Sequence, residues 1–125
     1  MTGIISVEPV LAIDTESNSL FAYRERVCLV QISTPRRDYL VDPLAITDLS
    51  PLAPIFANRT QQKIFHAAEY DVICLKRDYR FEIHNIFDTM IAARILGEPQ
   101  VGLGSLLSTY FLLNLDKRYQ RADWA

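Results

Sequence analysis

Two acids, Asp14 and Glu16, close an apolar stretch that reads LAIDTES. In a β-strand, residues i and i+2 point to the same face, so these two carboxylates would converge while Thr15 points away. Like charges this close repel each other unless a hard cation with oxygen ligands, such as Mg²⁺ or Mn²⁺, neutralises them. The alternative is that both acids lie in a solvated turn after the strand, and so short a pattern does not decide between the two.

A third acid, Asp71, stands in KIFHAAEYD, where a strand-like run passes into a helical one. An acid in the first helical turn interacts favourably with the helix dipole, so helix stabilisation alone could explain it. If the strand that ends at His66 lay beside the strand that ends at Ile13, however, Asp71 would face the same cluster as Asp14. His66 could bond a substrate or the backbone, and we favour a structural histidine. Asp88, at another expected helix start, is best explained as a cap.

Short runs rich in Val, Ile, Leu and Tyr predict strands, and departures from alternation predict helices. The first three expected strands form a meander and the fourth follows a helix; they span Val10–Ile13, Val27–Ser33, Tyr39–Val41 and Lys63–His66. The expected helices span Asp48–Ala57, Tyr70–Arg77, Thr89–Leu96 and an amphipathic stretch from Leu103 to about Asn114. This order predicts an α/β fold in which helices pack on the faces of a mixed sheet.

The chain has 125 residues, 50% of them hydrophobic, which predicts a single domain over 1–125 with one core. A net charge of -2 argues against a protein that holds nucleic acid by a broad basic surface. Glu8, Pro9 and Asp14 interrupt the first apolar stretch too early for a membrane span, so we expect a soluble, cytoplasmic protein without membrane contact. Cys28 and Cys74 are expected to be buried, reduced thiols.

From Val10 onward the sequence resembles the ribonuclease D branch of the DEDD 3'-5' exonucleases, in their DEDDy form. Asp14-Thr15-Glu16 matches the first motif of that family, and His66-Ala67 through Asp71 matches the second. Further matches follow in the family's order, namely Phe87-Asp88-Thr89, the helix start Gly102-Leu103-Gly104, and Asp116-Lys117 with Asp123-Trp124. The resemblance implies a ribonuclease H-like fold, which is a mixed five-stranded sheet flanked by helices.

The resemblance also implies hydrolysis of single-stranded nucleic acid from its 3' end with two divalent cations, Mg²⁺ or Mn²⁺, and RNA favoured over DNA. Asp14 would bridge both ions, Glu16 would hold the first and Asp71 the second, so these three would be the catalytic residues and metal ligands. The substrate contacts that it implies are Thr15, Leu20 and His66. The stretch DTESNSL is also similar to the proofreading exonuclease domain of bacterial DNA polymerase I, where the leucine packs on the terminal base of the substrate.

The family completes its site with a third motif, Tyr-x3-Asp, and Tyr119 and Asp123 have that spacing. We interpret this match as a coincidence, because Asp116-Lys117 and Asp123-Trp124 fill a segment that precedes the third motif in the family. A metal ligand also needs firm packing, which chain ends without docking elements do not provide. The chain is therefore expected to lack family segments at both ends, with only MTGIISVEP ahead of the first expected strand.

We therefore expect weak activity or none from these residues alone, unless a fourth acid comes from a partner or a downstream segment. The alternative from another class is a non-catalytic nucleic-acid-binding or interaction module on the same fold. The sequence does not indicate an oligomeric state.

Overall fold

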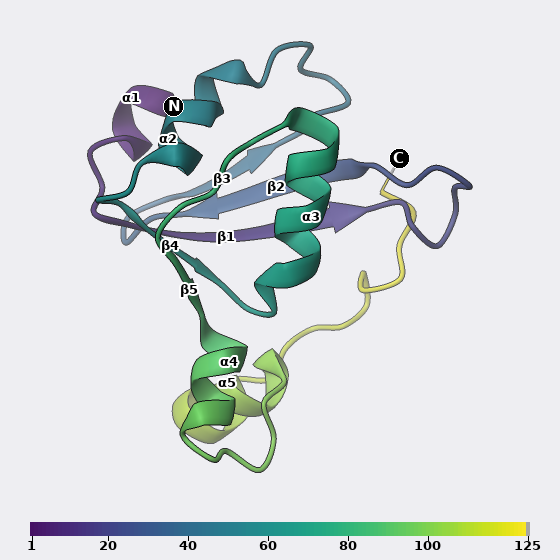
Figure 1. Cartoon of the computed structure of the whole chain (residues 1–125). Coiled ribbons are helices and arrows are strands. Elements are labelled where there is room, and N and C mark those ends of the chain that lie inside the picture. The colour runs from purple at the N-terminus through teal and green to yellow at the C-terminus, as the bar shows by residue number, and fades with distance from the viewer. Residues whose placement is uncertain (125) are drawn as a thin grey trace.

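One five-stranded sheet forms the centre of the computed structural model, which describes residues 1–124 (Figure 1). Its strands lie in the order β3-β2-β1-β4-β5. The first three are antiparallel neighbours, and β4 and β5 run parallel to β1. Their bounds are β1 Val10–Ser17, β2 Val27–Ser33, β3 Asp38–Val41, β4 Gln62–Phe65 and β5 Ile86–Asp88. The predicted mixed sheet and its opening meander are therefore confirmed, and β4 lies beside β1 as the argument for Asp71 required.

Strand β1 is longer than predicted, because it continues past Ile13 to Ser17. Its ladder with β2 pairs Asp14 with Gln31 and places Glu16 opposite Leu29 before the register shifts at Ser17. Backbone hydrogen bonds hold a ladder whatever the side chains are, so polar residues did not end the strand. The interpretation of Asp14 and Glu16 as residues of a solvated turn is therefore wrong.

Helix α3, Ala68–Tyr79, lies across one face of the sheet (Figure 1). It is longer at both ends than the predicted helix over Tyr70–Arg77. Its buried side chains are Ala68, Asp71, Cys74 and Leu75, which recur at helical spacing on one face. The helix ends where Arg80 takes a left-handed conformation at φ 58° and its amide donates to the carbonyl oxygen of Lys76 at 2.9 Å.

Two shorter helical segments replace the single helix predicted over Asp48–Ala57. A 3₁₀ turn, η1, spans Ser50–Leu52, and α2 spans Ala53–Ala57. Asp48 lies ahead of both and accepts a hydrogen bond from the Ser50 amide at 2.8 Å. Prolines at the start of each segment lack an amide donor, which favours short, separately initiated turns. A further short helix, α1, spans Thr2–Ile5 and was not predicted.

Helices α4, Thr89–Ile95, and α5, Leu103–Phe111, lie together beyond the β5 edge of the sheet (Figure 1). The prediction extended the last helix to about Asn114, which is wrong. Helix α5 stops earlier because Leu112 takes a left-handed conformation at φ 57°, and its amide closes the helix end on the Ser108 carbonyl oxygen at 3.2 Å. An apolar run longer than the helix hid this stop in the sequence.

The hydrophobic core is built from the sheet together with α3 and the short helical segments α1, η1 and α2. Leu11 and Ile13 of β1 are buried in it, as are Val30 and Ile32 of β2. Cys28 and Cys74 are buried free thiols, as predicted. In residues 1–124 no helix is long and apolar enough to cross a membrane.

Candidate functional site

Asp14 and Glu16 lie on the face of β1 that turns away from the core. Since Leu11 and Ile13 are buried in the core, strand alternation directs residues 12, 14 and 16 to the opposite face. The pleat of β1 therefore brings the two carboxylates together, as the spacing predicted. Gln31 of β2 stands opposite Asp14 in the ladder and adds a polar amide to the same side of the sheet.

An open groove of about 430 Å³ runs over this face beside Asp14. Its floor comes from β1, β2 and β4, and its wall from the starts of α4 and α5. The residues that line it are Ala12, Ile13, Asp14, Gln31, Ser33, Ile64, Phe65, His66, Thr89 and Leu103. Gln31 and Ser33 were not predicted as site residues. Their signal was the alternation of β2, in which both polar residues share one face of an otherwise apolar strand.

Asp71 occupies a core position of α3, and only 7% of its surface is exposed. It lies in the first turn of the helix, as predicted. The hydroxyl of Thr15 donates a hydrogen bond to its Oδ1 atom. Thr15 does point away from Asp14 and Glu16, as the strand pattern required, and it points toward Asp71. The hydrogen bond therefore makes Thr15 an orienting partner of the third acid.

Burial raises the pKa of all three carboxyl groups, and repulsion between carboxylates adds to this for Glu16 and Asp71. Burial raises the pKa of Asp14, although the backbone amide of Thr15 and the nearby His66 partly offset this. Burial also raises the pKa of Glu16, and the charges of Asp14 and Asp71 raise it further. For Asp71, burial raises the pKa to about 6 against the stabilising hydrogen bond from Thr15. Glu16 thus lies in the field of the other two carboxylates, and His66 offsets only part of the effect at Asp14.

The donor set suits a hard divalent cation, because carboxylate oxygens are the ligands that Mg²⁺ and Mn²⁺ prefer. An added positive charge would relieve the repulsion that raises the pKa of Glu16. Among residues 1–124, however, no group of three His, Cys, Asp or Glu side chains is already arranged to hold a metal ion. The residues therefore fit a cation by chemistry and charge, and their side chains would have to draw together around it.

His66 follows β4 directly and lines the groove beside Asp14. Its Nδ1 atom lies 2.9 Å from the Thr89 hydroxyl oxygen, and that hydroxyl donates to the Phe65 carbonyl oxygen at 3.1 Å. Since the Thr89 proton is used by Phe65, Nδ1 of a neutral His66 must be the donor in its bond to Thr89. The structure thus gives His66 the structural bond that the sequence favoured, in a position that also borders the groove.

Asp88 caps α4, as predicted, and also holds the start of α3. Its Oδ1 atom accepts hydrogen bonds from the amides of Met90 at 2.8 Å and Ile91 at 3.2 Å. The amides of Ala67 and Ala68 donate to the same carboxylate at 3.1 and 2.8 Å. Burial raises the pKa of Asp88, but these four donors outweigh it, so its pKa lies below the usual range. One carboxylate therefore ties together the two helices that border the site.

Leu20 lies on the loop after β1 with 67% of its surface exposed, and it does not line the groove. Tyr119 is exposed and lies in a turn. Within residues 1–124 no helix follows Phe111, so Tyr119 and Asp123 do not stand on the helix that carries the third motif in the family. The interpretation of their spacing as a coincidence stays a prediction.

Comparison with known proteins places this geometry in context. Residues 4–125 match a family model described as 3'-5' exonuclease. Protein RRP6-like 3 of Arabidopsis thaliana is 42% identical over 99% of this chain and 14% of its own length. The catalytic core of RRP6 from Trypanosoma brucei is 35% identical, with a TM-score of 0.93 over 98% of this chain and 34% of that one. Escherichia coli RNase D, an exoribonuclease involved in structured RNA processing, is 31% identical to this chain and has a TM-score of 0.90. The match covers 98% of this chain and 33% of the RNase D chain.

A further structural relative bears on the metal. Brucella melitensis NrnC with bound Mg²⁺ is 25% identical to the chain, with a TM-score of 0.81 over 96% of this chain and 60% of that one. Divalent cations therefore occur in this fold. The chain spans only a small part of its curated relatives, 14% of the Arabidopsis protein.

Proposed function

The chain belongs to the 3'-5' exonuclease family, and from this premise we propose that it is the nuclease domain of an exoribonuclease that shortens single-stranded RNA from its 3' end. The observation that carries the proposal is that β1 places Asp14 and Glu16 on one face, while Thr15 between them donates a hydrogen bond to a third acid, Asp71. The charges of Asp14 and Asp71 both raise the pKa of Glu16, which supports their closeness to it. An acidic site of this kind does not suit an anionic substrate unless cations come with it.

Two divalent cations, Mg²⁺ or Mn²⁺, are proposed as the cofactors, with Asp14, Glu16 and Asp71 as their ligands. When bound, such ions would activate water and stabilise the charge of the leaving oxygen in phosphodiester hydrolysis. The residues of the chain do the positioning. The β1 ladder sets Asp14 and Glu16 on one face, and the Thr15 hydroxyl orients the carboxylate of Asp71.

The groove beside Asp14 is the proposed place for the 3'-terminal nucleotide. His66, Thr89 and Gln31 supply polar groups along it, and Ile64 and Leu103 supply apolar surface. Sites for small polar ligands commonly combine such surfaces. We also propose Leu20 as a contact to the terminal base, on the strength of the similarity in the DTESNSL stretch.

The experiment is an assay with single-stranded RNA labelled at its 5' end, in Mn²⁺, Mg²⁺ or a chelator. Stepwise shortening from the 3' end that needs the metal and disappears in Asp14→Ala supports the proposed function. A matched control is Asp48→Ala, which removes an acid that lies just ahead of the 3₁₀ turn and does not line the groove, and it should leave the ladder of products unchanged. Binding of RNA without any shortening of it would instead support the non-catalytic module.

A further inference from the structure

We propose that the loop of residues 18–26 is a stacking platform for single-stranded nucleic acid, with Tyr23 and Phe21 as base-contacting residues. We further propose that Tyr70 is the positioning residue that holds this platform beside the acidic site. The inference rests on the proposed function and adds a second substrate contact to it.

The base of the loop is closed by Asn18, which is buried although it follows the last strand residue, Ser17. The side-chain Oδ1 atom of Asn18 accepts a hydrogen bond from the backbone amide of Arg26 at 2.9 Å. The backbone amide of Asn18 donates to the carbonyl oxygen of Arg26 at 3.3 Å. The Asn18 carbonyl oxygen then accepts from the amides of Phe21 at 2.9 Å and Ala22 at 3.0 Å. These bonds give the loop a defined turn structure instead of a free tether.

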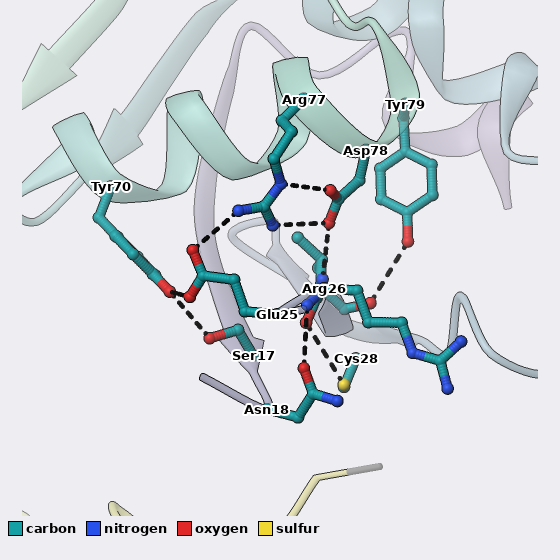
Figure 2. A network of polar contacts seen from close by, with 10 residues as sticks. Ser17, Asn18, Glu25, Arg26, Cys28, Tyr70, Arg77, Asp78 and Tyr79 are labelled. Carbon is teal, nitrogen blue, oxygen red and sulfur yellow. Dashed lines mark hydrogen bonds and ion pairs between the residues drawn. The ribbon is translucent and has the colours of Figure 1, made fainter. Parts of the chain in front are cut away.

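The hydroxyl of Tyr70 on α3 is hydrogen-bonded to Glu25 of the loop (Figure 2). The Tyr70 hydroxyl donates to Oε2 of Glu25, and the Ser17 hydroxyl oxygen lies 3.1 Å from the same phenol oxygen. Tyr70 therefore joins the loop and the end of β1 to the first turn of α3. Asp71 follows Tyr70 directly on the helix. Glu16 precedes Ser17, the bonding partner of Tyr70, on the strand. A change in these hydrogen bonds of Tyr70 would therefore change the position of the loop relative to Glu16 and Asp71.

Arg77 of α3 forms ion pairs with Glu25 of the loop and with Asp78 (Figure 2). Its Nη1 atom lies 2.8 Å from Oε1 of Glu25, and its Nε atom lies 2.6 Å from Oδ1 of Asp78. Asp78 in turn accepts from the Val27 amide at 2.8 Å, at the start of β2. The helix thus holds the loop at Glu25 and the strand that follows it at Val27. The loop is therefore hydrogen-bonded at its base, through Asn18 and Arg26, and held to α3 through Glu25. These contacts fix the backbone from which its remaining side chains project.

The side chains that the loop presents suit a single-stranded nucleic acid. Tyr23 is 102% exposed and Phe21 is 56% exposed, so their rings are free to stack. Arg24 and Arg26 on the same loop are exposed and supply positive charge for a phosphate backbone. Aromatic rings that stack on bases next to cations that follow the backbone are the usual means of binding single strands. The loop begins directly after Ser17, so it extends from the same end of β1 as Glu16.

The first test is fluorescence anisotropy with a short, labelled, single-stranded oligoribonucleotide in a chelator, so that no hydrolysis occurs. Tyr23→Ala should weaken binding roughly tenfold, which is typical of the loss of one stacked base. Tyr110→Ala is the matched control, because Tyr110 is another exposed tyrosine, on α5 away from the loop, and this change should leave the affinity unaltered.

The second test addresses Tyr70. Tyr70→Phe removes only the hydroxyl and should weaken binding several-fold in the wild-type chain, but should have no added effect in Tyr23→Ala, because the platform has already lost its stacking residue. It should also speed tryptic cleavage after Arg24, since a released loop is a better protease substrate. Tyr110→Phe is its control, because it too breaks a tyrosine-to-glutamate hydrogen bond, to Glu98, without touching the loop.

The proposal is overturned if Tyr23→Ala binds RNA as tightly as wild type, if the wild-type chain does not bind RNA, or if Tyr70→Phe weakens binding equally in both backgrounds. The last result would mark a merely structural role of Tyr70. These outcomes are separable from failure of the proposed function. A chain that binds RNA through Tyr23 but releases no nucleotides keeps the platform and loses the nuclease, and metal-dependent release with no effect at Tyr23 does the reverse.

Discussion

The hydroxyl of Thr15 in β1 donates a hydrogen bond to the buried carboxylate of Asp71 in α3. This bond crosses from the central strand to the helix above it. The bond gives a hydrogen-bond donor to Asp71, a charged residue on the buried face of α3, where the other buried residues are apolar. The bond stabilises the ionised form of Asp71, which burial disfavours. The strand thus supplies Asp14 and Glu16 on one face and orients Asp71 from the other.

Replacing Thr15 by Val keeps the shape of the side chain and removes the donor. We expect the free energy of unfolding at neutral pH to fall by about 1–2 kcal/mol, because a buried carboxylate loses a hydrogen bond. The rotamer of Asp71 is also released, so Mn²⁺ affinity should fall. Urea unfolding and calorimetry check these effects. Thr60→Val, which removes an exposed hydroxyl bonded to Asn58, is the control and should change stability little; equal effects of both changes would contradict the role of Thr15.

The raised pKa of Asp71 predicts that the metal-free protein loses stability as pH rises through the weakly acidic range. Between about pH 4 and about 6 the unfolded chain releases the Asp71 proton while the folded chain keeps it, since the folded pKa is about 6. Over that window the group should lower the free energy of unfolding by up to about 3 kcal/mol, and its cost should stay constant at higher pH.

Asp71→Asn isolates this contribution, because the amide cannot ionise and still accepts the bond from Thr15. In a chelator, the difference in stability between Asp71→Asn and wild type should grow in favour of the variant from about pH 4 to about pH 6. Parallel curves of the free energy of unfolding against pH would show that burial does not raise the pKa of Asp71. The same variant should lose the stabilisation that Mn²⁺ gives the wild type.

Asp88→Ala should be more damaging than the loss of an ordinary helix cap. Cap removal costs about 1 kcal/mol, and here the amides of Ala67 and Ala68 at the start of α3 lose their acceptor as well. We expect a loss of about 2–3 kcal/mol in urea unfolding, and weaker Mn²⁺ binding because the first turn of α3 carries Asp71. Asp48→Ala removes only local contacts to Ser50 and should cost less. If the two variants unfolded at the same urea concentration, the second role of Asp88 would be refuted.

The sequence predicted what depends on local pattern. Strand alternation placed Asp14 and Glu16 on one face, and helical spacing put Asp71 in a first turn; both are confirmed. The pattern failed at ends of elements. Strand β1 runs on through its acids because β2 continues to pair with it, and α5 stops at Leu112 although the apolar run continues.

Contacts between distant elements could not be predicted from one sequence. The bonds from Ala67 and Ala68 to Asp88 form only because β4 and β5 lie side by side and deliver α3 and α4 to one corner. Ala67 itself has φ 61°, a conformation that glycine usually supplies, so no local signal marked this helix start. Strand β5 was missed for a similar reason, since three residues are too few to show alternation.

The central claim is that Asp14, Glu16 and Asp71 form a divalent cation site, and calorimetric titration with Mn²⁺ tests it most directly. The wild-type chain should bind Mn²⁺ with a measurable heat, Asp14→Ala should show none, and Asp48→Ala, with the same change in net charge, should bind as the wild type does. Equal binding by the wild type and Asp14→Ala would contradict the account.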